Sequence, residues 1–379
     1  MSRWFKLDTL SKKIKLMNSE SRKAILITYP NQFALSEAEG LAESVGYSIL
    51  EVISQKNITR SRFGVGKGKA EEVKERVAAL KPDVIIFDEI LKPSQQYNLA
   101  RLCKIDIVDR EKLILEIFLN RAVTNESKIQ VKLAQLKYDI VRVKEKVRLA
   151  KLGEQPGFYG LGKYDADVHI LDIKRRTTIL KKKLQAEERK RALHRIQRLS
   201  GNIPLISLTG YTSAGKTSLF NILTDENKET STKLFTTLTT FTRASEIEGR
   251  KVLVSDTIGF ISKLPPYMIE AFKSTLSELN YANVVLLIID FTDDVPVIKK
   301  KLMSSIEILS KLQISFQKCI LVLNKIDMVK NNEIKSKIQD LNITENIDQI
   351  IPISAQLGYN LPRLKKLISL QIADFPAIS

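Results

Sequence analysis

Short apolar runs alternate with helical patterns in the N-terminal part of the chain. In chain order, the runs and the patterns that separate them occupy residues 24–29, 36–45, 47–54, 70–80 and 84–87. Continuous apolar runs are typical of strands buried on both faces of a parallel sheet, and the intervening helices provide the crossover connections. The pattern therefore predicts a parallel α/β domain over residues 1–124.

The pattern changes over residues 125–200, where apolar positions recur only at helical spacing. Val131, Leu133, Leu136, Ile140 and Val143 mark one such helix, the stretch from Gly153 to Gly162 interrupts it, and a second helix is predicted over residues 174–199. Two long helices joined by a break predict an antiparallel helical hairpin.

Buried-strand runs return in residues 201–379, at 203–208, 251–255, 319–323 and 350–353. The first run leads into Gly-Tyr-Thr-Ser-Ala-Gly-Lys-Thr at residues 210–217, which has the spacing G-x-x-x-x-G-K-[ST]. Between a strand and a helix, this spacing builds a phosphate-binding loop whose backbone N–H groups point at the phosphates. The motif predicts a P-loop domain with a doubly wound, mostly parallel sheet.

The motif also predicts which residues contact the phosphates and the metal ion. Lys216 reaches the β- and γ-phosphates, and the Thr217 hydroxyl ligates Mg²⁺. The loop and the first helical turn supply the other nucleotide contacts, which we expect from Thr212, Ser213, Ala214, Gly215 and Ser218.

The base is predicted from Asn324-Lys325-Ile326-Asp327, which follows a buried-strand run. Asp327 can accept hydrogen bonds from both N1–H and the N2 amine of guanine, whereas adenine offers no such pair of donors. Lys325 would lie across the base. Ser354-Ala355-Gln356, after the strand run at 350–353, resembles a last guanine-contact loop. Together with the P-loop, these residues predict binding of GTP and GDP with Mg²⁺.

Two further segments are candidates for the switch regions of a GTPase. Asp256-Thr257-Ile258-Gly259 follows a strand run, so Asp256 would hold Mg²⁺ through water and the Gly259 N–H would contact the γ-phosphate. A threonine from the tract at 235–242 should complete the Mg²⁺ shell. We predict Thr237, with the alternatives Thr236, Thr239 and Thr240 left open. Lys216, Thr237 and Gly259 are thus the predicted catalytic groups.

Phe260 occupies the position after Gly259, where many GTPases have a glutamine that orients the attacking water. A phenylalanine can neither donate nor accept a hydrogen bond. The sequence therefore predicts slow intrinsic hydrolysis, with the water positioned by another group or by a partner.

These motifs and their flanks resemble the HflX family of translational GTPases. In the C-terminal part, the segment from Asp256 to Asp290 carries the resemblance. In the N-terminal part, the resemblance rests on the glycine–lysine loop at 64–69. It also rests on five further segments, at residues 98–99, 108–110, 114–118, 121–122 and 128–136. The resemblance covers residues 24–370.

The resemblance implies a factor that binds the large ribosomal subunit and its rRNA in the GTP state, hydrolyses GTP slowly, and in some members splits or rescues stalled ribosomes. Members also bind or hydrolyse ATP through the N-terminal domain, so an ATP site there stays open. The family usually has an asparagine in place of Ser213 and Asp-Pro in place of Thr239-Thr240. Many members carry a C-terminal domain, whereas residues after Ser354 leave room for one closing helix, as in a short form.

Charge and composition favour a nucleic-acid partner. The net charge is +18, and residues 125–200 hold 20 Lys and Arg against 9 Asp and Glu. A charged outer face of two helices is the simpler explanation of this excess, but its one-sidedness favours an RNA-phosphate surface. Phe158 and Tyr159 could stack on bases or pack against a neighbour. The loop at 64–69 could bind phosphate or form a tight turn before the next helix.

Other features narrow the class of protein. Cys103 and Cys319 lie in apolar runs and are expected to be reduced. No run approaches the ~18 apolar residues of a membrane span, and residues 1–20 lack a signal-peptide core, which predicts a cytoplasmic protein. We also expect a monomer. Two alternative functions stay open. One is an RNA-binding or remodelling protein that uses ATP through its N-terminal domain, and the other is a GTPase in tRNA modification or ribosome assembly.

Overall fold

The computed structural model describes most of the chain. The described residues are 21–58, 61–151, 163–200, 203–226, 234–235, 241–272, 276, 278–341 and 349–373. The chain divides into two compact units, the first made of residues 1–117 and 141–160 and the second of residues 118–140 and 161–379. The predicted division into three domains at residues 125 and 201 stays a prediction.

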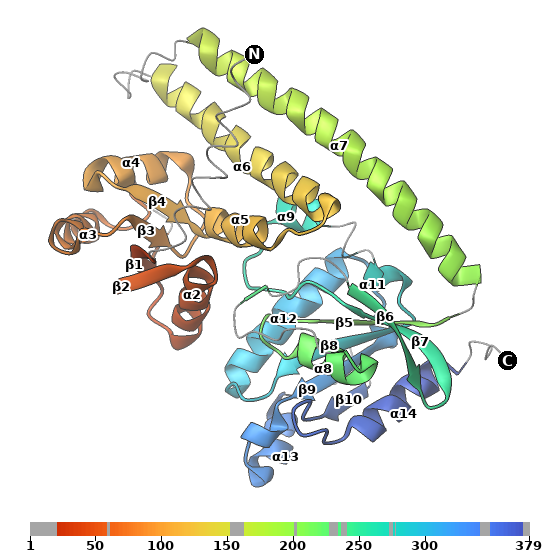
Figure 1. The fold of residues 1–379 in the computed structure, drawn as a ribbon. Coiled ribbons are helices and arrows are strands. Elements are labelled where there is room, and N and C mark those ends of the chain that lie inside the picture. Colours follow the sequence, from red (N-terminus) through yellow and green to blue (C-terminus); the bar gives the residue numbers. More distant parts are fainter. Residues whose placement is uncertain are drawn as a thin grey trace. The chain divides into compact units, whose positions relative to one another are not determined.

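The first unit contains a parallel sheet of four strands in the order β2-β1-β3-β4 (Figure 1). A parallel sheet was predicted, whereas its fourth strand and the strand order were not. Its elements are β1 (Arg22–Thr28), α2 (Gln32–Val45), β2 (Tyr47–Ser54), α3 (Lys67–Leu80), β3 (Val84–Phe87), α4 (Pro93–Cys103), β4 (Asp106–Asp109) and the first part of α5 (Arg110–Arg121). Strands β1 and β3 are apolar throughout their centres because helices cover both faces of the sheet.

Local signals set the helix ends in this unit. The Asn31 side chain accepts a hydrogen bond from the Ala34 N–H at the start of α2, and Gly46 ends that helix in the left-handed region. Gly66 precedes α3, so the glycine–lysine loop forms the turn into this helix. Phosphate binding by the loop stays a prediction.

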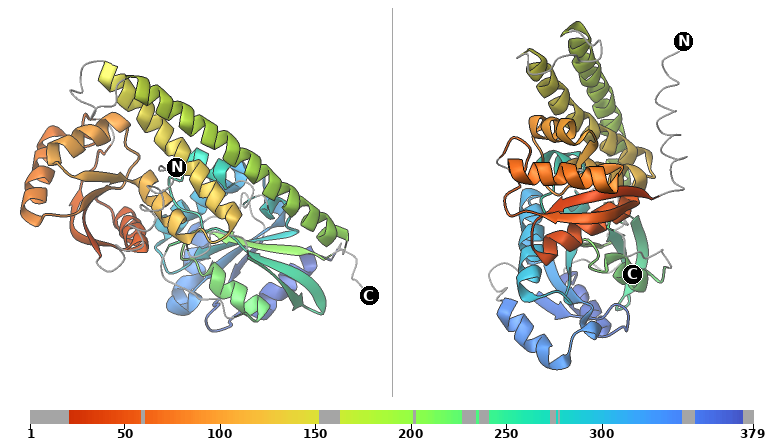
Figure 2. Two further views of the ribbon diagram at one scale, coloured as in Figure 1. Left: turned by 45° about the horizontal axis from the view of Figure 1, so that its top comes forward. Right: turned by 90° about the vertical axis from the view of Figure 1, so that its left-hand side faces the viewer.

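The middle region forms the predicted helical hairpin from α6 (Asn125–Lys151) and α7 (Lys163–Ser200). Figure 2 shows α7 as the longest helix of the chain, antiparallel to residues 125–140 of α6. Helix α7 begins 11 residues before the predicted start at Lys174, because apolar and polar residues alternate from Tyr164 to Ile170, a period of two that does not indicate a helix. Phe158 and Tyr159 lie outside the described residues.

The second unit contains a six-stranded sheet in the order β10-β9-β8-β5-β7-β6, in which only β6 is antiparallel to its neighbour. The strands are β5 (Leu205–Gly210), β6 (Phe241–Ile247), β7 (Arg250–Asp256), β8 (Val284–Asp290), β9 (Cys319–Asn324) and β10 (Gln349–Pro352). The helices are α8 (Lys216–Thr224), α9 (Pro266–Ala271), α11 (Glu278–Tyr281), α12 (Val295–Lys311), α13 (Asn331–Leu341) and α14 (Leu361–Gln371), with 3₁₀ turns η1 (Phe316–Lys318) and η2 (Ile326–Met328).

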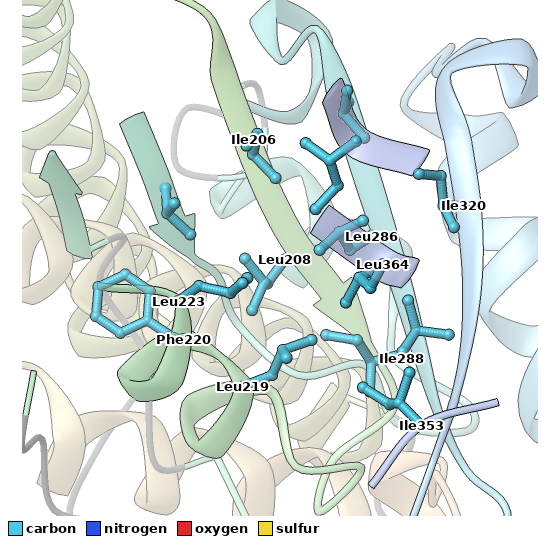
Figure 3. Close-up of a cluster of buried hydrophobic side chains, with 14 of the residues drawn as sticks. Ile206, Leu208, Leu219, Phe220, Leu223, Leu286, Ile288, Ile320, Ile353 and Leu364 are labelled. Carbon is cyan, nitrogen blue, oxygen red and sulfur yellow. The ribbon is translucent and has the colours of Figure 1, made fainter. Parts of the chain in front are cut away.

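The apolar core of this unit holds the P-loop strand and helix together. Figure 3 shows Leu219, Phe220 and Leu223 of α8 beside Ile206 and Leu208 of β5. From β5 the chain adds strands first on the β7 side and then on the β8 side. The carboxyl ends of β5 and β8 therefore flank a topological switch point, which is where ligands bind in open α/β sheets.

Both cysteines are buried free thiols, as expected of core residues. Among the residues described, no helix combines the length and the apolar character needed to cross a membrane.

Candidate functional site

The loop at residues 210–217 leaves the carboxyl end of β5 and enters α8, in the strand–loop–helix context that the motif requires. Gly210 has a φ of 135°, and a Cβ atom there would lie 2.1 Å from the Ile288 carbonyl oxygen of β8. Gly215 has a φ of 88°, and its Cβ would lie 2.3 Å from Asn324 Nδ2. At both positions a side chain would have a strained backbone conformation and would clash with a neighbouring group, so the loop needs glycine there.

Replacement of Gly210 by alanine should strongly destabilise the second unit. The left-handed strain costs roughly 1–2 kcal/mol and the clash with a backbone carbonyl that cannot move aside adds about 1–3 kcal/mol. Urea unfolding should show this loss. Gly249→Ala is the matched control, because Gly249 has a φ of 75° but open space around it. Equal losses in the two variants would contradict the close-approach argument.

Lys216 begins α8 and is buried. Its ammonium group donates to the carbonyl oxygens of Gly210 (3.2 Å) and Tyr211 (2.7 Å), so it folds back over the loop. Burial lowers the pKa of Lys216 to about 8, and the nearby Asp256 carboxylate opposes this shift. A bound polyphosphate would supply the negative charge that the ammonium group needs in this buried position.

Thr217 and Asp256 form a pair of oxygen ligands beside this lysine. The Thr217 hydroxyl donates to Asp256 Oδ2 at 3.1 Å, and both residues are buried. A hydroxyl and a carboxylate are suitable ligands for Mg²⁺, which usually binds one or two protein oxygens together with phosphates and waters. This pair of oxygen ligands therefore suits a metal that arrives with a nucleotide.

The segment after Asp256 is hydrogen-bonded to the P-loop. The Phe260 N–H donates to the Gly210 carbonyl (2.9 Å), and the Thr212 N–H donates to the Phe260 carbonyl (2.8 Å). Gly259 lies against Lys216, because a Cβ at residue 259 would be 2.9 Å from Lys216 Nζ. The Phe260 ring itself is 1% exposed and belongs to the core. Thr237 and its alternatives Thr236, Thr239 and Thr240 lie outside the described residues.

The residues predicted to contact guanine meet the P-loop at the carboxyl end of β9. Asn324 Nδ2 donates to the Ala214 carbonyl (2.9 Å), and its Oδ1 accepts from the Ala355 N–H (3.0 Å). Asn324 thus joins the P-loop to the loop that starts at Ser354. Ser354 is buried, and its hydroxyl accepts from the Leu357 N–H.

Lys325 and Asp327 differ in their surroundings. Lys325 adopts the left-handed region and its ammonium group lies 2.6 Å from Asp290 Oδ2. Burial raises the pKa of Asp290, but hydrogen bonds from Lys325 and Thr292 outweigh it and lower the pKa overall. Asp327 lies in η2 and is exposed, as is Gln356. The Asp327 carboxylate is therefore accessible to a ligand.

Two members of the site were not predicted from the sequence. Asp290 fixes the Lys325 side chain, and its only signal was its place at the end of a strand. The Tyr211 hydroxyl accepts from the Ser262 N–H at 2.8 Å and so connects the P-loop to the segment after Gly259. Tyr211 occupies a position of the motif where any residue is allowed, so the motif does not predict a role for it. Of the remaining predicted contacts, Thr212 and Ala214 are buried, Ser218 is half-buried and Ser213 is exposed.

Known proteins match most of the chain. Family models match residues 32–119 ("GTP-binding GTPase N-terminal"), 121–198 ("GTP-binding GTPase Middle Region") and 205–325 ("50S ribosome-binding GTPase"). The chain is 40% identical over 335 residues to GTPase HflX of Methanocaldococcus jannaschii, covering 88% of this chain and 82% of the relative. It belongs to the HflX family of GTPases.

Other HflX relatives and a solved structure agree with this assignment. GTPase HflX of Escherichia coli is 34% identical over 333 residues, covering 87% of this chain and 77% of the relative. A crystal structure of a GTP-binding protein from Sulfolobus solfataricus in complex with GDP is 29% identical with a TM-score of 0.50, covering 94% of this chain and all of that one. The chain is thus an HflX GTPase with the P-loop fold described above.

Proposed function

We propose that this protein binds the large ribosomal subunit in its GTP state and leaves it after slow hydrolysis to GDP. The match of residues 205–325 to a 50S ribosome-binding GTPase is the observation that carries the proposal. A protein that alternates between the ribosome and free solution would work in the cytoplasm. Its proposed role is to split or rescue stalled ribosomes.

The assignment of the nucleotide site follows the contacts of the described residues. Backbone N–H groups of the P-loop cradle the phosphates, Lys216 turns from the carbonyls it now binds toward the β- and γ-phosphates, and Asp327 selects guanine. Thr217, Asp256 and Thr237 would hold Mg²⁺, with Asp256 acting through water. When bound, the ion would supply positive charge against the charge that develops on the phosphates.

Slow hydrolysis follows from the position of Phe260. Its side chain is in the core and offers no hydrogen bond to a water molecule, and its backbone N–H is already bonded to Gly210. A water aligned by a fixed donor or acceptor is what accelerates hydrolysis in related reactions. Steady-state turnover of the isolated protein at several per second would contradict this part of the proposal.

Helix α7 offers the surface for rRNA. Lys174, Arg175 and Lys181 to Lys183 are exposed, and no acidic side chain among the described residues forms an ion pair with them. Exposed cations without acidic partners are available to phosphates, and each phosphate contact lowers the slope of log K against log salt by roughly 0.7–0.9. The charge of this helix therefore predicts ribosome binding that weakens steeply with salt.

Co-sedimentation with isolated large and small subunits tests the proposal at physiological salt. We expect pelleting with the large subunit in a non-hydrolysable GTP analogue and not in GDP. Replacing Lys181, Lys182 and Lys183 by glutamine should reduce binding more than tenfold and make the slope of log K against log salt less negative by about 2–3. The control replaces three exposed lysines of the GTPase domain, Lys311, Lys330 and Lys335. Equal pelleting in all nucleotide states would contradict the proposal.

A further inference from the structure

Phe118 lies near the end of α5 and contacts two other phenylalanines. Its ring meets Phe235 edge-to-face at 4.9 Å and 85°, and Phe272 at 4.8 Å and 76°. The three side chains are 1%, 2% and 2% exposed. Such edge-to-face pairs hold rings in a defined geometry and not merely out of water.

The two partners of Phe118 belong to the two segments proposed to sense the γ-phosphate. Phe235 is two residues before Thr237 in sequence. Phe272 ends α9, the helix that begins seven residues after Gly259. Phe118 itself lies well before the part of the chain that matches the 50S ribosome-binding GTPase model. A single ring from outside that part of the sequence therefore contacts both segments.

Helix α5 is also fixed at its other end. Arg110, its first residue, is 2% exposed and forms ion pairs with Glu37 and Asp88, which are buried in the first unit. Phe118 is eight residues after Arg110 in this helix, or about 12 Å along the axis. A helix of this length transmits displacement as a rigid element.

A second contact to α9 is an ion pair that solvent weakens. Lys137 of α6 forms an ion pair with Glu270, but the Glu270 side chain is 65% exposed. Exposed ion pairs are screened by solvent and contribute little. Of these two contacts to α9, the buried aromatic cluster is the stronger, and it is the one that joins α9 to α5.

We propose that Phe118 is a positioning residue that holds both switch segments and passes their nucleotide-dependent change to α5. This inference rests on the proposed GTP–GDP switch. When the γ-phosphate draws Thr237 and Gly259 inward, Phe235 and Phe272 move with their segments and the Phe118 ring must follow. By thermodynamic reciprocity, a force applied to α5 alters the switch segments in turn.

Hydrogen exchange of the full-length protein tests the coupling, with GDP compared with a non-hydrolysable GTP analogue. In the wild type, we expect the exchange of the α5 amides at 110–121 to differ between the two nucleotides. The difference should disappear in Phe118→Leu and also in Phe272→Leu, which leaves α5 unmutated. Phe87→Leu, a buried phenylalanine of β3, is the matched control and should retain it.

The outcomes separate this inference from the nucleotide site itself. Residues 210–217 should be protected by both nucleotides in all variants, and the dissociation constant for GDP should stay within twofold of the wild type. A protected P-loop with no α5 difference in the wild type, or a difference that survives Phe272→Leu, would overturn the role of Phe118 alone. A P-loop that neither nucleotide protects would overturn the proposed function as well. Should Phe118→Leu fail to fold, Phe272→Leu decides.

Discussion

Asp327→Asn should reduce kcat/KM for GTP by about 100- to 1,000-fold and make xanthosine triphosphate the better substrate. In the proposed site the carboxylate accepts from N1–H and the N2 amine of guanine, whereas an amide would place its donor against the amine. Xanthine has a carbonyl in place of that amine, so the asparagine N–H₂ finds an acceptor. Asp327 is exposed, so the substitution leaves the core unchanged. Steady-state hydrolysis of the two nucleotides measures the change.

Asp340→Asn is the matched control for this prediction, because Asp340 is an exposed carboxylate of α13 and no predicted contact of the base. It should leave kcat/KM for both nucleotides unchanged. An unaltered preference for GTP in Asp327→Asn would show that other groups select the base and would remove Asp327 from the site.

Lys216→Ala should lower kcat/KM for GTP by about 1,000-fold, because it removes the one side-chain cation predicted to follow the charge on the γ-phosphate. Binding of GDP should weaken less than hydrolysis, since backbone N–H groups still hold the β-phosphate. Single-turnover hydrolysis and fluorescence titration with a labelled GDP separate the two effects. Urea unfolding of the same variant separates a loss of hydrolysis from a loss of stability, since Lys216 also donates to the Gly210 and Tyr211 carbonyls.

Lys251→Ala is the control for this second prediction. Lys251 is exposed and lies in β7, the strand that leads to Asp256. The same loss of charge there should change neither constant by more than twofold. A Lys216→Ala protein that retained wild-type hydrolysis would mean that the ammonium group stays on the Gly210 and Tyr211 carbonyls during the reaction.

Much of the fold could be read from local sequence. Strands β2 and β3 have the predicted bounds, and β5, β7, β9 and β10 lie within two residues of the apolar runs that predicted them. A strand buried on both faces of a sheet is apolar at almost every position, so it can be recognised from its own residues alone. The start of α7 was missed because the apolar residues of its first turns alternate with polar ones, a period of two that does not indicate a helix.

Contacts within the site were less accessible to sequence reasoning. Asn324 was predicted as a contact of the nucleotide, and the structure adds two hydrogen bonds, to the Ala214 carbonyl and the Ala355 N–H. The ion pair of Lys325 with Asp290 and the hydrogen bond of Tyr211 with the Ser262 N–H also join residues that are distant in the chain. No spacing rule predicts such pairs.

The sequence alone determined the P-loop, the candidate base-recognition residues and the family, because the backbone conformation of a phosphate loop is set by glycines at fixed local spacing. Only the tertiary structure decided which side chains support these motifs. Parallel strands bring their carboxyl ends to one edge of the sheet, and there Asn324 reaches a loop 110 residues earlier in the chain. Packing likewise brought Phe118 to Phe235 and Phe272. Burial of apolar surface has no preferred partner in the sequence, so no local pattern predicts which rings will meet.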